Sequence, residues 1–148
     1  MKYACLVMDH DDTAVQSEAT VNYPFFEMTI PTFCPGAEVS LKKYTAGCYE
    51  LGFAQMCRQW YGLTDKDLEE EFRGWQSYVR THVPLPNPGI RELLHRFRAA
   101  GGKICVVSHS SRENITRDYG IHFGMQPDDI FGWDLPEEQR KPSTYPLE

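Results

Sequence analysis

The sequence lacks several features that mark whole classes of proteins. No hydrophobic run approaches the roughly 18–20 apolar residues of a membrane-spanning helix. The apolar run Leu6-Val7-Met8 meets Asp9 too soon for a signal peptide, which needs about 7–15 apolar residues. Basic residues are in the minority, with 15 Lys and Arg against 21 Asp and Glu and a net charge of −6. We therefore expect no membrane and no nucleic-acid partner, since binding a phosphate backbone needs clustered Lys and Arg.

Cysteine pairs are missing as well. The five cysteines are odd in number and scattered, without a CxxC motif. His82, His95 and His122 have neither the spacing nor the neighbours of a zinc site. These patterns predict reduced thiols in a cytoplasmic protein, and no zinc.

What the sequence does contain is an alternation of strand and helix patterns. Two short apolar runs, residues 2–8 and Lys103–Val107, end abruptly in polar residues, as buried strands do. Residues 130–133 form a third, brief strand candidate. Helical patterns lie between them, so the sequence predicts an α/β fold with a parallel, Rossmann-like sheet.

The segment between the first two strands has the spacing of amphipathic helices. One apolar stripe consists of Phe53, Met56, Cys57 and Trp60. A second consists of Leu68, Phe72, Trp75 and Val79. Gly62 separates the two helices, and Thr64 with Asp67 forms a capping pair for the second. Both stripes predict a small helical core, whereas residues 24–36, broken by three prolines, predict only a short helix.

The proline-rich stretch 84–89 is the best internal boundary. We expect it to separate an all-helical insert, residues 15–87, from an α/β core made of residues 1–14 and 88–148. Asn87 is predicted to cap the helix that follows this boundary.

The next helix has a capping pair of its own. Ser110 and Glu113 have the spacing of a cap and its partner, and Gly120 is predicted to end that helix.

Polar side chains follow the first two predicted strands, at the edge of a parallel sheet where ligands bind. The carboxylates of Asp9 and Asp11 would repel each other, which costs free energy unless a cation binds them. A magnesium ion would hold both. One carboxylate could attack phosphorus while the other donates a proton to the leaving alcohol. Ser108 offers a hydroxyl for a phosphoryl oxygen, and Lys141 offers a positive charge.

These motifs resemble those of the haloacid dehalogenase superfamily. The run from Leu6 to Thr13 is similar to its first motif, an apolar strand followed by D-x-D-x-T. The strand ending in Ser108 resembles the second motif, and Arg140-Lys141-Pro142 resembles the third. The order is correct over nearly the whole chain, and the helical insert occupies the place of the superfamily's helical cap.

The resemblance implies a role for each matching residue. Asp9 would be the nucleophile that forms a phospho-aspartyl intermediate, and Asp11 the general acid and base. Lys141 would stabilise charge, Ser108 would bind phosphate, and Thr13 would support the loop. The implied cofactor is Mg²⁺, held at Asp9 and Asp11. An acid at position 11 favours phosphoryl transfer over dehalogenation.

Two histidines beside these motifs have more than one interpretation. His109 follows Ser108 and would either line the phosphate site or lie in a turn. His10 is expected to point away from the sheet, and a role in specificity is the alternative.

The sequence also departs from the superfamily pattern. Asp12 stands where glycine is common, and the acidic fourth motif expected after Lys141 is missing. Asp128-Asp129 precedes the lysine and is interpreted as a turn or strand-entry pair. We therefore expect a truncated chain with weakened metal binding. Its first strand would be an exposed sheet edge, so either self-association or a missing segment is expected.

Several functions remain open from the sequence. The leading one is a magnesium-dependent phosphatase acting on a small phosphorylated metabolite. A sugar phosphomutase shares the same motifs, and a non-catalytic phosphate-binding fragment is a third alternative. A receiver-type signalling domain fits poorly, because its middle strand should end in an aspartate, not in Ser108.

Overall fold

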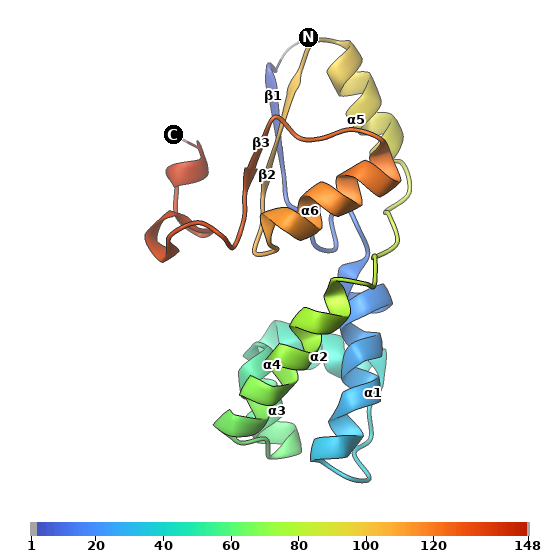
Figure 1. Ribbon diagram of the computed structural model, residues 1–148, viewed down its shortest axis with the longest axis vertical. Coiled ribbons are helices and arrows are strands. Elements are labelled where there is room, and N and C mark those ends of the chain that lie inside the picture. Colours follow the sequence, from blue (N-terminus) through green and yellow to red (C-terminus); the bar gives the residue numbers. More distant parts are fainter. Residues whose placement is uncertain (1–2, 148) are drawn as a thin grey trace. The chain divides into compact units, whose positions relative to one another are not determined.

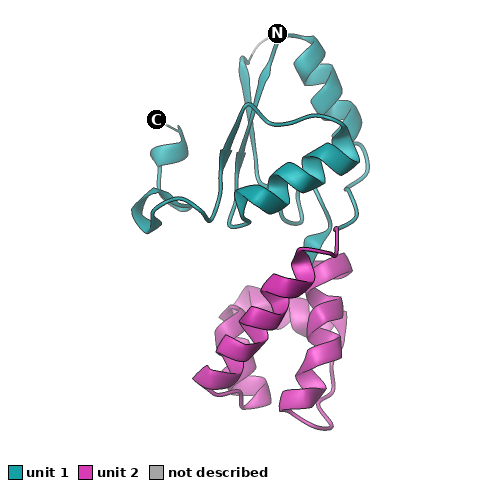
Figure 2. Ribbon diagram, viewed as in Figure 1, with its two compact units in different colours: residues 1–17, 84–148 teal, residues 18–83 magenta. Residues whose placement is uncertain are grey.

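The computed structural model describes residues 3–147, which divide into two compact units. Figure 2 shows the first unit, Met1–Ser17 with Pro84–Glu148, and the second, Glu18–Val83. No helix in the described part of the chain has the length and apolar character to cross a bilayer.

The first unit is built on a parallel sheet of three strands in the order β1-β2-β3 (Figure 1). The strands are β1 (Cys5–Met8), β2 (Lys103–Val107) and β3 (Asp129–Phe131). Leu6 is in register with Ile104, and Val106 with Ile130. The predicted α/β fold with a parallel sheet is confirmed, although Lys2 of the predicted first strand lies outside the described residues.

Two helices pack on this sheet, α5 (Ile90–Ala99) on β2 and α6 (Arg112–Asp118) on β3. Alternate residues of β2, Ile104 and Val106, are fully buried, as expected for a strand covered by helices. The remaining buried members of this core are Met8, Ala14, Val15, Leu94, Ile115, Tyr119, Phe123 and Ile130.

The start of α5 differs from the prediction. Asn87 does not cap the helix, because its side-chain amide instead donates a hydrogen bond to the carbonyl oxygen of Thr13, 2.9 Å away. Gly89, with φ of 82°, occupies the capping position. A contact between distant segments of the chain has replaced a local one.

The boundaries of α6 also differ from the prediction. Ser111 caps this helix by accepting from the amide of Asn114, and the side chain of Ser110 is engaged elsewhere. The helical conformation does not end at Gly120, because a π-helical turn continues through Tyr119–Phe123. The turn ends at Gly124, whose φ is 66°. Buried Tyr119 and Phe123 stabilise this extension by packing into the core.

The second unit is entirely helical. After a π-helical turn (Glu18–Asn22) it contains α1 (Tyr23–Phe33), α2 (Leu41–Leu51), α3 (Phe53–Tyr61) and α4 (Asp65–Val79). Short 3-10 turns, Glu137–Gln139 and Tyr145–Leu147, belong to the first unit. The buried core of the helical unit consists of Phe26, Ile30, Tyr44, Met56, Cys57, Tyr61 and Leu63.

The end of helix α3 and the cap of α4 follow the prediction, whereas Trp60 of the predicted stripe is exposed and Tyr61 is buried instead. Gly62 ends α3 in the left-handed region with φ of 71°. Thr64 and Asp67 form a reciprocal capping box at the start of α4. Here the signals are local, so the sequence predicts them well.

Helix α1 contradicts the expectation of a short helix, because it has 11 residues despite two prolines. Pro24 lies in the first turn, where no backbone N–H is required, and Pro31 lies near the end. Burial of Phe25, Phe26 and Ile30 offsets the cost of the second proline.

The buried face of α4 is rotated from the predicted stripe. Phe72 is 47% exposed, whereas Glu71 is only 6% exposed. Burial raises the pKa of the Glu71 carboxyl to about 7. The unit therefore contains a titratable acid in a largely apolar interior, which hydrophobic spacing alone does not predict.

Replacing this acid should change how stability depends on pH. Because the pKa of Glu71 is raised to about 7, the folded state binds its proton more tightly than the unfolded chain does. That stabilisation is complete below the ordinary glutamate pKa and is lost as pH rises through the folded value. Urea denaturation at about pH 5 and pH 8 should show a loss of roughly 2 kcal/mol. The Glu71→Gln variant should lack this loss.

Glu70 provides the matched control, since it is the exposed neighbour on the same helix. Glu70→Gln should keep the pH dependence of the unmodified protein. If the stability of Glu71→Gln depended on pH as that of the unmodified protein does, the assignment of this pH dependence to Glu71 would be wrong.

Candidate active site

The loop that follows β1 is held by hydrogen bonds to its own backbone. The carbonyl oxygen of His10 accepts from the amides of Thr13, Ala14 and Val15 at 3.3, 2.8 and 3.2 Å. Asp12 takes the left-handed conformation with φ of 52°, which aspartate tolerates better than most residues. The loop therefore presents Asp9 and Asp11 from a defined turn at the carboxyl end of the strand.

A buried pair anchors this loop to α6. The His10 ring nitrogen Nε2 lies 3.1 Å from Oδ2 of Asp118, and both side chains are 1% exposed. Arg117 donates from Nε to the other carboxylate oxygen of Asp118 at 2.7 Å. The structure thus gives His10 an anchoring position inside the protein and does not support a role in substrate specificity.

Lys141 and Asp9 meet although they are far apart in the sequence. Lys141 Nζ donates to Asp9 Oδ2 at 2.8 Å, with the two side chains 40% and 36% exposed. The ring nitrogen Nε2 of His109 donates to the backbone carbonyl of Lys141 at 2.8 Å. The structure therefore brings these three predicted site residues together, and His109 holds the lysine segment.

Asp11 lies in a second cluster with the residues that follow β2. Its Oδ2 accepts from the hydroxyl of Ser108 at 3.2 Å and from that of Ser110 at 2.7 Å. The Ser110 amide donates to the Ser108 hydroxyl at 3.1 Å. Ser110 was predicted to cap a helix, not to contact Asp11. The only feature of the sequence that could have indicated this contact is that Ser110 lies two positions after Ser108.

Thr13 is the one predicted site residue whose side chain stays outside these contacts in the described part of the chain. Its side chain is exposed, and its backbone carbonyl is the group that Asn87 binds. Thr13 thus supports the loop through its backbone.

The segment that carries Lys141 is held beside β3. The guanidinium of Arg140 lies over the ring of Trp133, 4.2 Å from its centre. The Trp133 amide donates to the carbonyl oxygen of Ser110 at 2.9 Å. Gly132 is buried at this junction, which ties the third strand to the Asp11 cluster.

The donor atoms at this edge suit a magnesium ion only in part. Asp9 and Asp11 offer hard oxygen ligands, and Mg²⁺ needs just one or two carboxylates where water and phosphate oxygens complete its shell. Within residues 3–147 there is no group of three or more His, Cys, Asp or Glu side chains that could hold a metal. The residues fit an ion that shares its coordination with a phosphate group.

Asp128 and Asp129 do not supply the missing ligand. Asp128 Oδ2 accepts from the Ile104 amide at 2.8 Å and pairs with Arg98 at 2.9 Å. Asp129 is the first residue of β3. Both therefore lie at the amino end of the parallel strands, away from Asp9, and the interpretation as a strand-entry pair is confirmed.

No protein-family profile and no curated protein matches the sequence, but solved structures match the fold. A haloacid dehalogenase-like hydrolase from Bacteroides fragilis has a TM-score of 0.76 and 18% identity over 99% of this chain and 70% of its own. A protein described as a phosphoglycolate phosphatase, from Lactobacillus plantarum, has a TM-score of 0.71 and 18% identity, covering 99% and 69%.

CbbY from Rhodobacter sphaeroides, solved with xylulose-(1,5)bisphosphate, has a TM-score of 0.65 and 16% identity, covering 97% of this chain and 69% of its own. Two further matches are covered over 67% and 66% of their length, so the chain spans about two thirds of these structures. The chain has the α/β fold of the haloacid dehalogenase-like hydrolases. At the level of fold, the resemblance drawn from the motifs is confirmed.

Gly132 provides a test of how tightly the site is packed. A Cβ atom there would lie 2.7 Å from the carbonyl oxygen of Ser110 and 3.1 Å from the amide nitrogen of Arg112, both backbone atoms. Gly132→Ala should therefore cost about 1–3 kcal/mol in the free energy of unfolding, measured in urea.

Exposed Gly120 is the matched control, since its added Cβ would meet only the end of the Gln126 side chain, at 3.3 Å. Gly120→Ala should change stability by less than about 1 kcal/mol. Equal effects of the two substitutions would show that the junction at Gly132 is not tightly packed.

Proposed function

We propose that this protein is a magnesium-dependent phosphate-ester hydrolase that acts on a small phosphorylated metabolite through a phospho-aspartyl intermediate. The observation that carries the proposal is the 2.8 Å contact between Lys141 Nζ and Asp9 Oδ2, at the same strand ends as Asp11 and Ser108. A carboxylate beside a fixed ammonium group suits nucleophilic attack on a phosphoryl group, because the cation stabilises charge on the transferred oxygens.

In the first step, a carboxylate oxygen of Asp9 attacks phosphorus. The new bond joins that oxygen to phosphorus, and the bond between phosphorus and the alcohol oxygen of the substrate breaks. Asp11, in its protonated form, donates its proton to the departing alcohol oxygen. Lys141 stabilises the negative charge of the phosphoryl oxygens.

In the second step, water attacks phosphorus and Asp11 takes up a proton from it. The bond between Asp9 and phosphorus breaks, which releases inorganic phosphate and regenerates the carboxylate. Ser110 keeps Asp11 oriented through its 2.7 Å hydrogen bond. Ser108 can then turn its hydroxyl toward a phosphoryl oxygen without leaving Asp11 unbound.

Magnesium, when bound, would neutralise phosphate charge, and Asp9 would hold it through its carboxylate and Asp11 through its backbone carbonyl. The helical unit Glu18–Val83 takes the place of a cap in chain order, between the Asp9 loop and the Ser108 strand.

Five free cysteines are in keeping with a reducing, cytoplasmic location.

Removing the nucleophile provides the direct test. Phosphate release from a panel of phosphate monoesters should require Mg²⁺ and should fall by roughly a thousandfold or more in Asp9→Asn. The control is Asp12→Asn, which removes the same charge from the same loop at a position where φ is 52°, a conformation that asparagine accepts.

Asp12→Asn should remain active. A folded wild-type chain without magnesium-dependent turnover would overturn the proposal for this chain and favour the non-catalytic alternative. Turnover that survives Asp9→Asn would exclude the phospho-aspartyl mechanism.

We also propose that the edge at β1 supports self-association. The strand order leaves β1 with one neighbour among the described strands, and Val7 on it is 45% exposed. An exposed edge offers unpaired backbone groups to a second strand. Light scattering should detect dimers whose fraction falls in Val7→Lys, because a charge on an edge strand opposes pairing. A monomer at all concentrations would contradict this proposal.

A further inference from the structure

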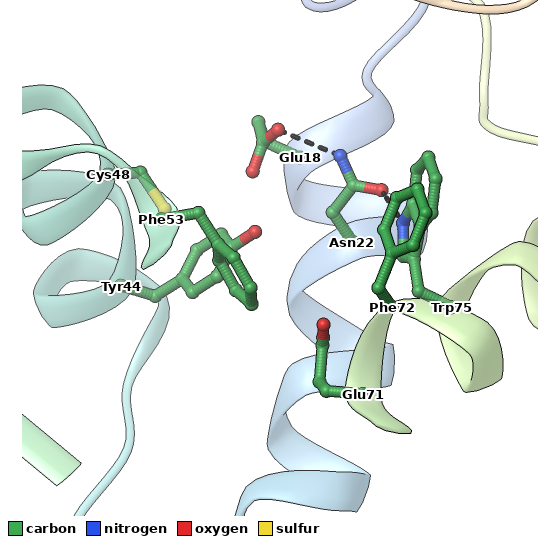
Figure 3. A pocket seen from close by; sticks show the side chains of 8 residues that line it. All are labelled: Glu18, Asn22, Tyr44, Cys48, Phe53, Glu71, Phe72 and Trp75. Carbon is green, nitrogen blue, oxygen red and sulfur yellow. Dashed lines mark hydrogen bonds between the residues drawn. The ribbon is translucent and has the colours of Figure 1, made fainter. Parts of the chain in front are cut away.

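The helical unit contains a cavity that the proposed phosphatase chemistry does not use. Its volume is about 290 Å³, close to the lower limit of roughly 300 Å³ for small-molecule sites. Four aromatic side chains and two carboxylic acids line most of it (Figure 3); they are Tyr44, Phe53, Phe72, Trp75, Glu18 and Glu71. All six belong to the helical unit, so the cavity lies within one compact part of the chain.

Glu71 is the most unusual group in this lining. It is 6% exposed and its carboxyl group points into the cavity (Figure 3). Desolvation by burial raises the pKa of this carboxyl group to about 7. A carboxylate enclosed in this way costs free energy unless a donor or a cation satisfies it. A ligand that carries a hydrogen-bond donor or a positive charge could therefore pair with this acid.

The aromatic side chains are arranged as walls on either side of this acid. The rings of Phe72 and Trp75 stack at 5.7 Å with planes 19° apart. Opposite them, Tyr44 and Phe53 meet with ring centres 6.5 Å apart (Figure 3). Trp75 is fixed in place, because its indole N–H donates to Asn22 Oδ1 at 2.9 Å.

The charge of the lining excludes one class of ligand and favours another. None of the residues that line the cavity is a lysine or an arginine, so an anion would find two acids and no positive partner. Glu18 adds its acid on the side of Asn22, whose amide donates to Glu18 Oε1 at 2.8 Å. Aromatic faces beside a carboxylate are the groups that recognise organic ammonium ions.

We propose that this cavity binds a small organic ammonium ion. The Glu71 carboxylate would be the ionic partner, and the rings of Tyr44, Phe53, Phe72 and Trp75 would contact the methyl or methylene groups around the nitrogen. The site shares no residue with the Asp9 site, and the proposal does not depend on phosphatase activity.

Calorimetric titration of the full chain at about pH 8 tests the proposal, because that pH lies above the Glu71 pKa of about 7 and the carboxyl group is ionised there. The probes are choline and its uncharged isostere, in which a tert-butyl group replaces trimethylammonium. Choline should bind at least about tenfold more tightly than the isostere. Equal affinities would show an apolar cavity without cation recognition and would overturn the proposal.

Two variants identify the carboxylate responsible. Glu71→Gln removes the charge with little change in size and should weaken choline binding by about tenfold or more, while binding of the isostere stays unchanged. Glu70→Gln, an exposed position on the same helix, should leave choline affinity unchanged. Absence of choline binding by the folded wild-type protein, or equal effects of the two variants, would also overturn the proposal.

Discussion

The ion pair between Lys141 and Asp9 is the contact on which the arrangement of the site depends. It joins the loop after the first strand to a segment beyond the last one, over 132 positions of sequence. Both side chains are more than a third exposed, so the pair adds little to folding stability. Its importance is positional, because it fixes a cation beside the carboxylate proposed to attack phosphorus. His109 reinforces it by holding the backbone of Lys141.

The loop that carries Asp9 and Asp11 is held in place by groups that take no part in the proposed chemistry. The buried pair of His10 and Asp118 ties the Asp9 loop to α6, and Asn87 holds the same loop through Thr13. Both side chains of the His10–Asp118 pair are buried, and each is the other's hydrogen-bond partner, so the contact orients the loop from inside the protein. The loop is therefore held from inside the protein, while its two acids remain at the surface where a substrate can reach them.

The candidate site could be predicted in part, because its residues lie directly after the strands. Parallel strands place their carboxyl ends at one edge, so Asp9, Asp11 and Ser108 were expected to lie near one another. Ser110 and Asn87 were assigned to helix caps from local spacing, and the structure uses both in contacts with the loop instead. Local rules could not weigh these alternatives, because the competing partner lies dozens of positions away.

The sequence by itself determined the strands, the alternation with helices and the capping box at Thr64, since each depends on neighbours within a few residues. It also determined which acids follow the strands. Tertiary structure alone decided that Glu71 is buried while Phe72 is exposed, and that α1 continues past Pro31. The reason is physical: a local pattern sets which faces a helix can present, but packing against distant helices selects the face that leaves water.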